Sequence, residues 1–302
     1  MFSRRHPYLF FLLTAAGLIA ATSVLLAVIG LFSPEKRQMH YGEKIGVIEV
    51  KGAILEAGPV LQNLREFARS GAIKAIVVRI DSPGGAVGPS QEIFREIRKI
   101  RENKPVIASM GAVAASGGYY IAAAADGIVA NAGTITGSIG VLMEYTNFEA
   151  LFEKIGLYPV IITSGKYKDI GSPLREMTGD EKKLLQDFVD TVHGQFVDDV
   201  AAGRKMNRKD VAEVADGRII TGQGAKQYGL VDRIGNLYDA VDWAAEKGGI
   251  QGKPEIVYPP EKKLSIINYV MDRVSSGIRQ QLGEISTGVL SGGYIYSPGQ
   301  SP

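Results

Sequence analysis

The chain has 302 residues, with 34 Lys and Arg against 32 Asp and Glu, and it contains no cysteine. A net charge of +2 gives no electrostatic reason to expect a nucleic-acid partner. The absence of cysteine excludes disulfides, thiolate nucleophiles and cysteine-ligated zinc. The length is enough for one large domain or two modest ones.

The first feature in chain order is a run from Tyr8 to Phe32 without a charged side chain. A helix of this length reaches about 37 Å, which is enough to cross a hydrocarbon core of about 30 Å. The run is longer than the apolar core of a cleaved signal peptide. Arg4 and Arg5 precede it and weakly favour an N-terminus on the inside. We therefore predict that residues 1–34 form a cytoplasmic stub and a single transmembrane helix in the cell (cytoplasmic) membrane, with the rest of the chain on the extracytoplasmic side.

After a linker at 35–44, apolar strands, Gly- or Ser-rich turns and helices alternate. The strands are rich in Val and Ile and mostly do not alternate with polar residues, as expected when both faces of a sheet are covered. Alternating strands and helices predict an α/β domain at 45–260 with a largely parallel sheet. The expected strands are Ile45–Val50, Ala75–Ile80, Val106–Ser109, Ile128–Asn131, Val160–Thr163 and Glu255–Tyr258. The expected helices are Pro59–Ser70, Pro89–Asn103, Tyr119–Ala125, a long one that starts with a capping box at Thr178–Glu181, Asp210–Val214, Gly222–Tyr228 capped by Thr221, and Leu237–Glu246 capped by Asn236.

The C-terminal part, 261–302, differs in composition from the domain before it. An amphipathic pattern runs from Leu264 to about Leu290. Beyond Ser291 the chain is rich in Gly, Ser and Pro, and we expect this tail to be flexible.

Ser116 is the candidate nucleophile. It lies where a short apolar strand gives way to Gly117, Gly118 and a predicted helix. Backbone N–H groups at a helix start attract negative charge, so a hydroxyl there can attack a carbonyl beside donors for the resulting oxyanion. The alternative is a packing turn in which Ser116 only caps the helix.

A second glycine-rich turn, Ser82–Gly85, also precedes a predicted helix. Consecutive glycines ahead of a helix form a nest of N–H groups that attracts anions. The turn lacks the Lys and Ser/Thr of a phosphate loop and the spaced glycines of a dinucleotide fingerprint. We expect Gly84, Gly85 and Gly117 to supply an oxyanion hole together.

The base is predicted by elimination. The histidines are His6, His40 and His193, too few for a histidine-ligated metal site, and only His193 could join a serine triad. We therefore expect a lysine base, which requires a pKa lowered from about 10.4 towards neutrality. Lys166 and Lys168 lie two residues apart after the fifth predicted strand, and their spacing does not decide between them.

Several motifs occur together and in a fixed order. They are Asp81–Gly85 (DSPGG), Gly111–Tyr120, Thr136–Val141 (TGSIGV) and Ser164–Pro173 (SGKYKDIGSP) with Arg175-Glu176-Met177. In these, from about Gly46 to Tyr258, the chain resembles the signal peptide peptidase A (SppA) family in its short, single-unit form. The resemblance implies a ClpP/crotonase-like fold of repeated ββα and βα units.

The resemblance also implies a serine protease with a Ser/Lys dyad. Ser116 matches the family nucleophile and Lys168, directly followed by Asp-Ile, matches its base. Ser138 would lie beside the lysine and orient it, and the oxyanion hole would fall at Gly84, Gly85 and Gly117. No cofactor or metal is implied.

The implied activity is degradation of cleaved signal peptides and other unfolded hydrophobic peptides at the membrane surface. In tandem-repeat members of the family the serine and lysine lie in different repeats. We therefore expect this single unit to form a homo-oligomeric ring whose dyads are completed between copies. Two other readings remain open: a crotonase-fold acyl-CoA hydratase or isomerase, and an inactive membrane scaffold.

Overall fold

The computed structural model describes residues 7–32, 43–260 and 291–295. The chain divides into two compact units, Met1–Tyr41 and Gly42–Pro302. In the first unit, α2 (Pro7–Phe32) is a helix of 26 residues, and the side chains are described over only part of it. The described residues contain no helix that is both long and apolar enough to span a membrane. The anchor stays a prediction.

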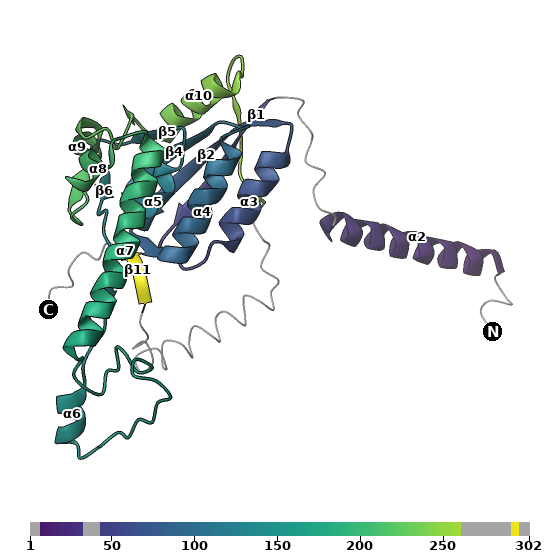
Figure 1. Cartoon of the computed structure of the whole chain (residues 1–302). Helices are drawn as coiled ribbons and strands as arrows, with labels where there is room; N and C mark the ends of the chain where they lie inside the picture. The colour runs from purple at the N-terminus through teal and green to yellow at the C-terminus, as the bar shows by residue number, and fades with distance from the viewer. Residues whose placement is uncertain (1–6, 33–42, 261–290, 296–302) are drawn as a thin grey trace. The chain divides into compact units, whose positions relative to one another are not determined.

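The second unit is built on an eight-stranded sheet with the strand order β10-β1-β2-β4-β5-β9 (Figure 1). Every pair along this path is parallel, as the alternation of strands and helices predicts. Two further strands extend the sheet, because β6 pairs parallel with β4 and antiparallel with β8. The bounds are β1 (Lys44–Lys51), β2 (Ile73–Ser82), β4 (Val106–Ala115), β5 (Gly127–Ala130), β6 (Ile135–Gly137), β8 (Ile219–Thr221), β9 (Arg233–Ile234) and β10 (Glu255–Val257).

Helices cover both faces of this sheet, which explains why its central strands are apolar on both sides. One face carries α3 (Gly58–Arg69), α4 (Val87–Ile100), α5 (Gly117–Ala123) and part of α7 (Gly179–Arg204), and α10 (Leu237–Gly248) packs on the other. The remaining helices are the short α6 (Glu149–Lys154), α8 (Arg208–Ala212) and α9 (Gly222–Gln227).

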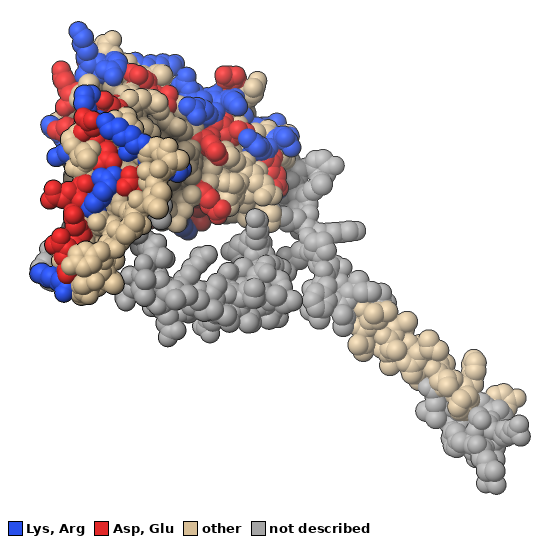
Figure 2. Space-filling view, turned by 60° about the horizontal axis from the view of Figure 1, so that its bottom comes forward, with Lys and Arg blue, Asp and Glu red and all other residues tan. Residues whose placement is uncertain are grey.

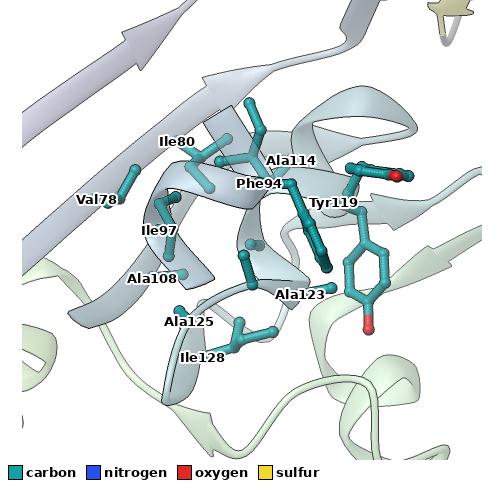
Figure 3. Close-up of a cluster of buried hydrophobic side chains, with 14 of the residues drawn as sticks. Val78, Ile80, Phe94, Ile97, Ala108, Ala114, Tyr119, Ala123, Ala125 and Ile128 are labelled. Atoms are coloured by element: carbon teal, nitrogen blue, oxygen red, sulfur yellow. The ribbon is translucent and has the colours of Figure 1, made fainter. Parts of the chain in front are cut away.

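The larger core lies between the sheet and the first group of helices (Figure 3). Tyr119 and Tyr120 of α5 are completely buried in it. The Tyr119 hydroxyl donates to the carbonyl of Leu230 at 3.0 Å, and burial raises the pKa of this phenol. The Tyr120 ring contacts Phe94 and Phe196, with ring centroids 4.9 and 4.8 Å apart. These contacts hold α5, and with it the turn at its start, in one position.

Only the C-terminal half of α7 joins this core. Thr178 and Glu181 form the predicted capping box at its start, and buried side chains begin regularly at Val192. The segment before α7, which includes α6, extends beyond this end of the helix and away from the sheet (Figure 1). The other predicted caps are also present, since Thr221 caps α9 and Asn236 caps α10.

Two sequence-based expectations are wrong. The predicted strand Val160–Thr163 is irregular and exposed, with Val160 at 86% and Ile162 at 93% of full exposure. A high β propensity gives a strand only where a neighbouring strand can pair with it. The composition after Ser291 predicts a flexible tail, but residues Ser291–Ile295 form β11, and residues 296–302 lie outside the described residues. The amphipathic segment Leu264–Leu290 lies outside the described residues.

β11 is the middle strand of a second, three-stranded sheet. It pairs antiparallel with β3 (Gly84–Ala86) on one side and with β7 (Leu142–Glu144) on the other. β3 carries two glycines of the Ser82–Gly85 turn, so this small sheet lies at the candidate site.

Candidate active site

Ser116 occupies a strained turn between β4 and α5. Its backbone has φ 52° and ψ −119°, a conformation that costs a non-glycine residue about 1–3 kcal/mol. The side chain does not cap the helix, which removes the packing-turn alternative in its simplest form. No hydrogen bond of the Ser116 Oγ to another described residue is present, although the residue is only 1% exposed. A hydroxyl presented in this way on a sharp strand-to-helix turn is available as a nucleophile.

The glycines at 84, 85 and 117 meet directly beside this turn. A Cβ atom on Gly117 would lie 3.2 Å from the Gly85 nitrogen, 3.3 Å from the Gly84 Cα and 2.6 Å from the Ser90 Oγ. Only a glycine at 117 therefore allows the two turns to approach this closely.

The backbone donors of the glycine turn differ in availability. The N–H of Gly84 donates to the Ser82 Oγ at 3.1 Å, and its carbonyl accepts from Ile54 at 2.9 Å. The N–H of Ala86 donates to the Ile54 carbonyl at 2.8 Å. Gly85 lies between Gly84 and Ala86 in the strand, so its N–H points to the opposite side. Of the three predicted oxyanion residues, Gly85 and Gly117 can offer their N–H groups to a ligand. Gly84, with φ 104°, shapes the turn.

Ser138 is brought next to the candidate nucleophile by backbone pairing. The Ser116 N–H donates to the Gly137 carbonyl at 2.9 Å, at the end of the β4–β6 ladder. Ser138 follows at once, has φ 50° and is 8% exposed. Its own N–H donates to the Arg218 carbonyl at 2.8 Å, which fixes the turn.

Lys168, in contrast, is not brought to Ser116 within the chain. It lies in the segment between α6 and α7, which extends away from the sheet (Figure 1). The side chain is exposed, and its Nζ makes no hydrogen bond or ion pair with any other residue that the structure describes. The described structure therefore brings Gly85, Gly117 and Ser138 to Ser116, and does not bring the predicted base, Lys168, to it.

Lys166 has a different environment from Lys168. Its Nζ forms an ion pair with the Asp180 Oδ2 at 2.8 Å. The hydrogen bond to this carboxylate, together with the neighbouring Tyr167, raises the pKa of Lys166. A raised pKa favours the charged amine, which cannot accept a proton. Lys166 is therefore the poorer candidate for a base.

The loop that carries both lysines is fastened to the start of α7 by Arg175. Its guanidinium binds the Asp169 Oδ2 at 2.8 Å and both carboxylate oxygens of Glu181 at 2.9 and 2.5 Å. Glu181 also accepts from the Thr178 N–H, and these contacts lower the pKa of Glu181 to about 2. Asp169 directly follows Lys168, so the clamp sets where the lysine is presented.

One feature of the site was missed by sequence reasoning. β11 lies along β3, at the side to which Gly85 points, although its Gly-rich sequence gave no strand signal. The sequence singled out His193 only as the one histidine that could join a serine triad. In the structure its Nε2 is buried and has no hydrogen-bond partner among the described residues.

A mostly parallel sheet of this order, with a strained serine between two glycine turns, defines a ClpP-like α/β hydrolase with a serine nucleophile. Comparison with known proteins agrees. The model of peptidase family S49 matches residues 98–251, and the Clp protease model matches residues 50–136.

Relatives from distant organisms give the same result. The chain is 48% identical to a Synechocystis sp. protein named "Putative protease" over 69% of this chain and 76% of that protein. It is 37% identical to the chloroplastic serine protease SPPA of Arabidopsis thaliana, over 81% of this chain and 35% of the relative. It is 38% identical to the "Putative signal peptide peptidase SppA" of Enterococcus faecium, over 66% of this chain and 62% of the relative. The chain belongs to peptidase family S49, the SppA family, and is a serine protease.

Proposed function

We propose that the protein is a membrane-anchored endopeptidase that uses Ser116 and Lys168 to degrade cleaved signal peptides and other unfolded hydrophobic peptides at the membrane surface. The observation that carries this proposal is the strained Ser116 turn packed against Gly85, beside an edge where a strand binds. The name of the Enterococcus faecium relative supports the substrate class.

In the proposed mechanism the Ser116 Oγ attacks the peptide carbonyl while neutral Lys168 accepts its proton. The carbonyl oxygen becomes an oxyanion, which the N–H groups of Gly85 and Gly117 stabilise. The lysine then passes the proton to the leaving amine, and an acyl ester remains on Ser116. Water, deprotonated by the same lysine, hydrolyses this ester and regenerates the serine. Ser138 would orient the amine.

We infer that the dyad forms between copies of the chain in a homo-oligomeric ring. Lys168 is exposed on a segment that extends from the body, so a neighbouring copy can receive it. The same segment and the first half of α7 carry many exposed apolar side chains, which a monomer would leave in water. Among them are Leu151, Ile155, Leu157, Tyr158, Val160, Ile162, Leu184 and Phe188. Head-to-tail contacts that use one such segment per subunit close into a ring.

Substrates would bind as extended strands. β11 lies between β3 and β7 and pairs with both, so these two strands can pair with an extended peptide in the same way. Backbone pairing of this kind requires an unfolded segment. Folded proteins should therefore resist cleavage. Figure 2 shows Lys and Arg interspersed with Asp and Glu on the face in view, which gives no reason to expect a strongly charged substrate.

The membrane part of the proposal rests on the uncharged run Tyr8–Phe32. It puts the protease domain on the extracytoplasmic side of the cell membrane, near the place where signal peptides are left after cleavage. A reporter enzyme fused after Pro34 that is active only in the cytoplasm would reverse this topology.

The central experiment is subunit complementation in the full chain. Ser116→Ala and Lys168→Ala should each abolish peptide hydrolysis, and the Ser116→Ala protein should also lose labelling by a serine-directed acylating reagent. Mixing the two inactive proteins under conditions of subunit exchange should restore a fraction of the activity. If a verified mixed oligomer stays inactive, the dyad is not shared between copies. Substantial activity of Ser116→Ala would refute the serine mechanism itself.

A further inference from the structure

A cavity of about 560 Å³ opens beside the turn that carries Ser138. One wall is this turn after β6, with Ser138 and Val141, and the start of β7, with Leu142. The facing wall is α7, with Val189, Asp190 and His193. Because Ser138 is tied to Ser116 through the Gly137 carbonyl, the cavity adjoins the candidate nucleophile. Nothing in the proposed mechanism uses its α7 wall.

His193 gives this cavity an unmet hydrogen-bonding group. Its Nε2 is buried and has no hydrogen-bond partner within the described ranges. Buried polar atoms without a partner are rare in folded proteins because they lose their contact with water. An atom of this kind in a cavity wall points to a partner supplied by a ligand.

Asp190 gives the cavity an uncompensated negative charge. Its Oδ1 accepts a hydrogen bond from the Gln186 amide at 2.7 Å, and it forms no ion pair with a described residue. The other carboxylate of the lining, Asp216, is neutralised by the guanidinium of Arg218, with contacts of 2.5 to 2.9 Å. The cavity therefore offers one free carboxylate and one imidazole nitrogen, next to the apolar Val141 and Val189.

The strand register shows which part of a peptide would face the cavity. In the small sheet Tyr294 pairs with Gly85 and Gly293 pairs with Leu142. A peptide in the place of β11 would have the carbonyl at the Tyr294 position opposite the Gly85 N–H. Side chains of directly opposed residues project to the same face of a sheet. The preceding residue, at the Gly293 position, would thus project to the same face as Leu142, which lines the cavity.

We propose that this cavity is a substrate subsite for the residue immediately N-terminal to the one whose carbonyl is attacked, and that it selects a long cationic side chain. The alkyl stem of a lysine or arginine packs against Val141 and Val189. Its N–H groups donate to the Asp190 carboxylate and to the His193 Nε2. Asp190 and His193 are the specificity-determining residues. This inference rests on the proposed peptidase activity and names a preference of that site.

The test compares two extended fluorogenic peptides that differ only at this position, with lysine in one and norleucine in the other. Norleucine keeps the alkyl stem and lacks the amine. Hydrolysis is measured with the full-length enzyme, and binding with its Ser116→Ala variant by fluorescence anisotropy. We expect kcat/KM and Kd to favour lysine by about 10-fold, as for one charge-assisted hydrogen bond. Asp190→Asn should remove the preference, and His193→Leu should reduce it.

Asp187→Asn is the matched control. It removes the same charge from the same helix, at a residue that is paired with Lys183 and does not line the cavity. The lysine preference should survive this change. Equal kcat/KM and Kd values for the lysine and norleucine peptides would overturn the proposal, and so would a lysine preference that persists in Asp190→Asn.

Binding separates this inference from the proposed function. If the peptides are not hydrolysed but bind with the lysine preference, the peptidase proposal fails and the subsite stands. If Asp190→Asn leaves selectivity unchanged but alters the mass of the assembly, the cavity belongs to a contact between copies and the subsite is refuted.

Discussion

The backbone N–H of Ser116 donates to the carbonyl of Gly137 at 2.9 Å. This hydrogen bond joins two turns that come from separate parts of the chain, one with the candidate nucleophile and one with Ser138. Both serines have positive φ values, 52° and 50°, so both turns hold a strained backbone. The strain at Ser116 and Ser138 persists because the pairing of β6 with β4 and with β8 holds both turns in place.

Ser138→Ala should lower kcat without unfolding the protein. The hydroxyl makes no hydrogen bond with another described residue, so its loss removes an orienting group and no structural contact. Misplacing a catalytic group by about 1 Å can cost about 10²-fold in rate, and we expect a loss of that order. Full activity of the alanine variant would show that Ser138 has no part in the reaction.

Gly85→Ala should damage both stability and activity. A Cβ there would lie 2.2 Å from the Ile54 carbonyl oxygen and 2.5 Å from its nitrogen, so backbone must move. Overpacking of this kind typically costs about 1–3 kcal/mol in the free energy of unfolding. Gly88→Ala is a suitable control because nothing lies within 4 Å of the place that its Cβ would take. Urea unfolding and peptide hydrolysis of the two variants measure the difference; equal behaviour would contradict the close approach.

Lys166→Ala should keep most of the activity that Lys168→Ala loses. The Asp180 carboxylate raises the pKa of Lys166, so this amine stays charged at neutral pH and cannot act as the base. The rates of the two single variants, measured at equal oligomer content, decide the assignment. Loss of activity in Lys166→Ala with retention in Lys168→Ala would reverse it.

The Arg175 clamp predicts a pH-dependent loss of order at the lysine loop. Contacts with Arg175 and Thr178 lower the pKa of Glu181 from 4.5 to about 2. A lowered folded-state pKa stabilises the fold above pH 4.5, and this contribution is lost as the pH falls towards 2. An NMR titration should therefore find Glu181 still ionised in the native protein at about pH 3.5, between these two values.

Arg175→Met provides the matched test of the clamp. Without the guanidinium, the Glu181 pKa should move up towards its ordinary value, and peptide hydrolysis should fall because Lys168 loses its fixed position. Arg175→Lys should restore part of the pKa shift but not the bidentate geometry. An unchanged Glu181 titration in Arg175→Met would show that Arg175 is not the main cause.

Deleting residues 291–302 should lower the KM for an extended peptide. β11 lies between β3 and β7, where we propose that substrates bind, and an internal strand there competes with them. If it occupied the site for about nine-tenths of the time, its removal would lower the apparent Kd about 10-fold. Deleting only 296–302 leaves β11 intact and serves as the control. A KM that is the same in both deletions would mean that substrates bind elsewhere.

Local patterns in the sequence determined much of this fold. The apolar runs that begin at Ile45, Ala75 and Val106 are strands of one parallel sheet, and the caps at Thr178, Thr221 and Asn236 start helices as predicted. These signals are local because strand burial and helix capping depend on residues close together in the chain. Ser116 was likewise marked by its glycine neighbours and by the motifs around it.

Tertiary structure decided what depends on distant partners. Val160–Thr163 has the composition of a strand but no described neighbour to pair with, whereas Ser291–Ile295 has the composition of a tail and finds two. Pairing of β4 with β6 put Ser138 beside Ser116. The ion pair with Asp180 gave Lys166 an environment that Lys168 does not share. A strand is stabilised by the hydrogen bonds of its neighbours, and a charge by the groups around it, so neither outcome is encoded in the segment alone.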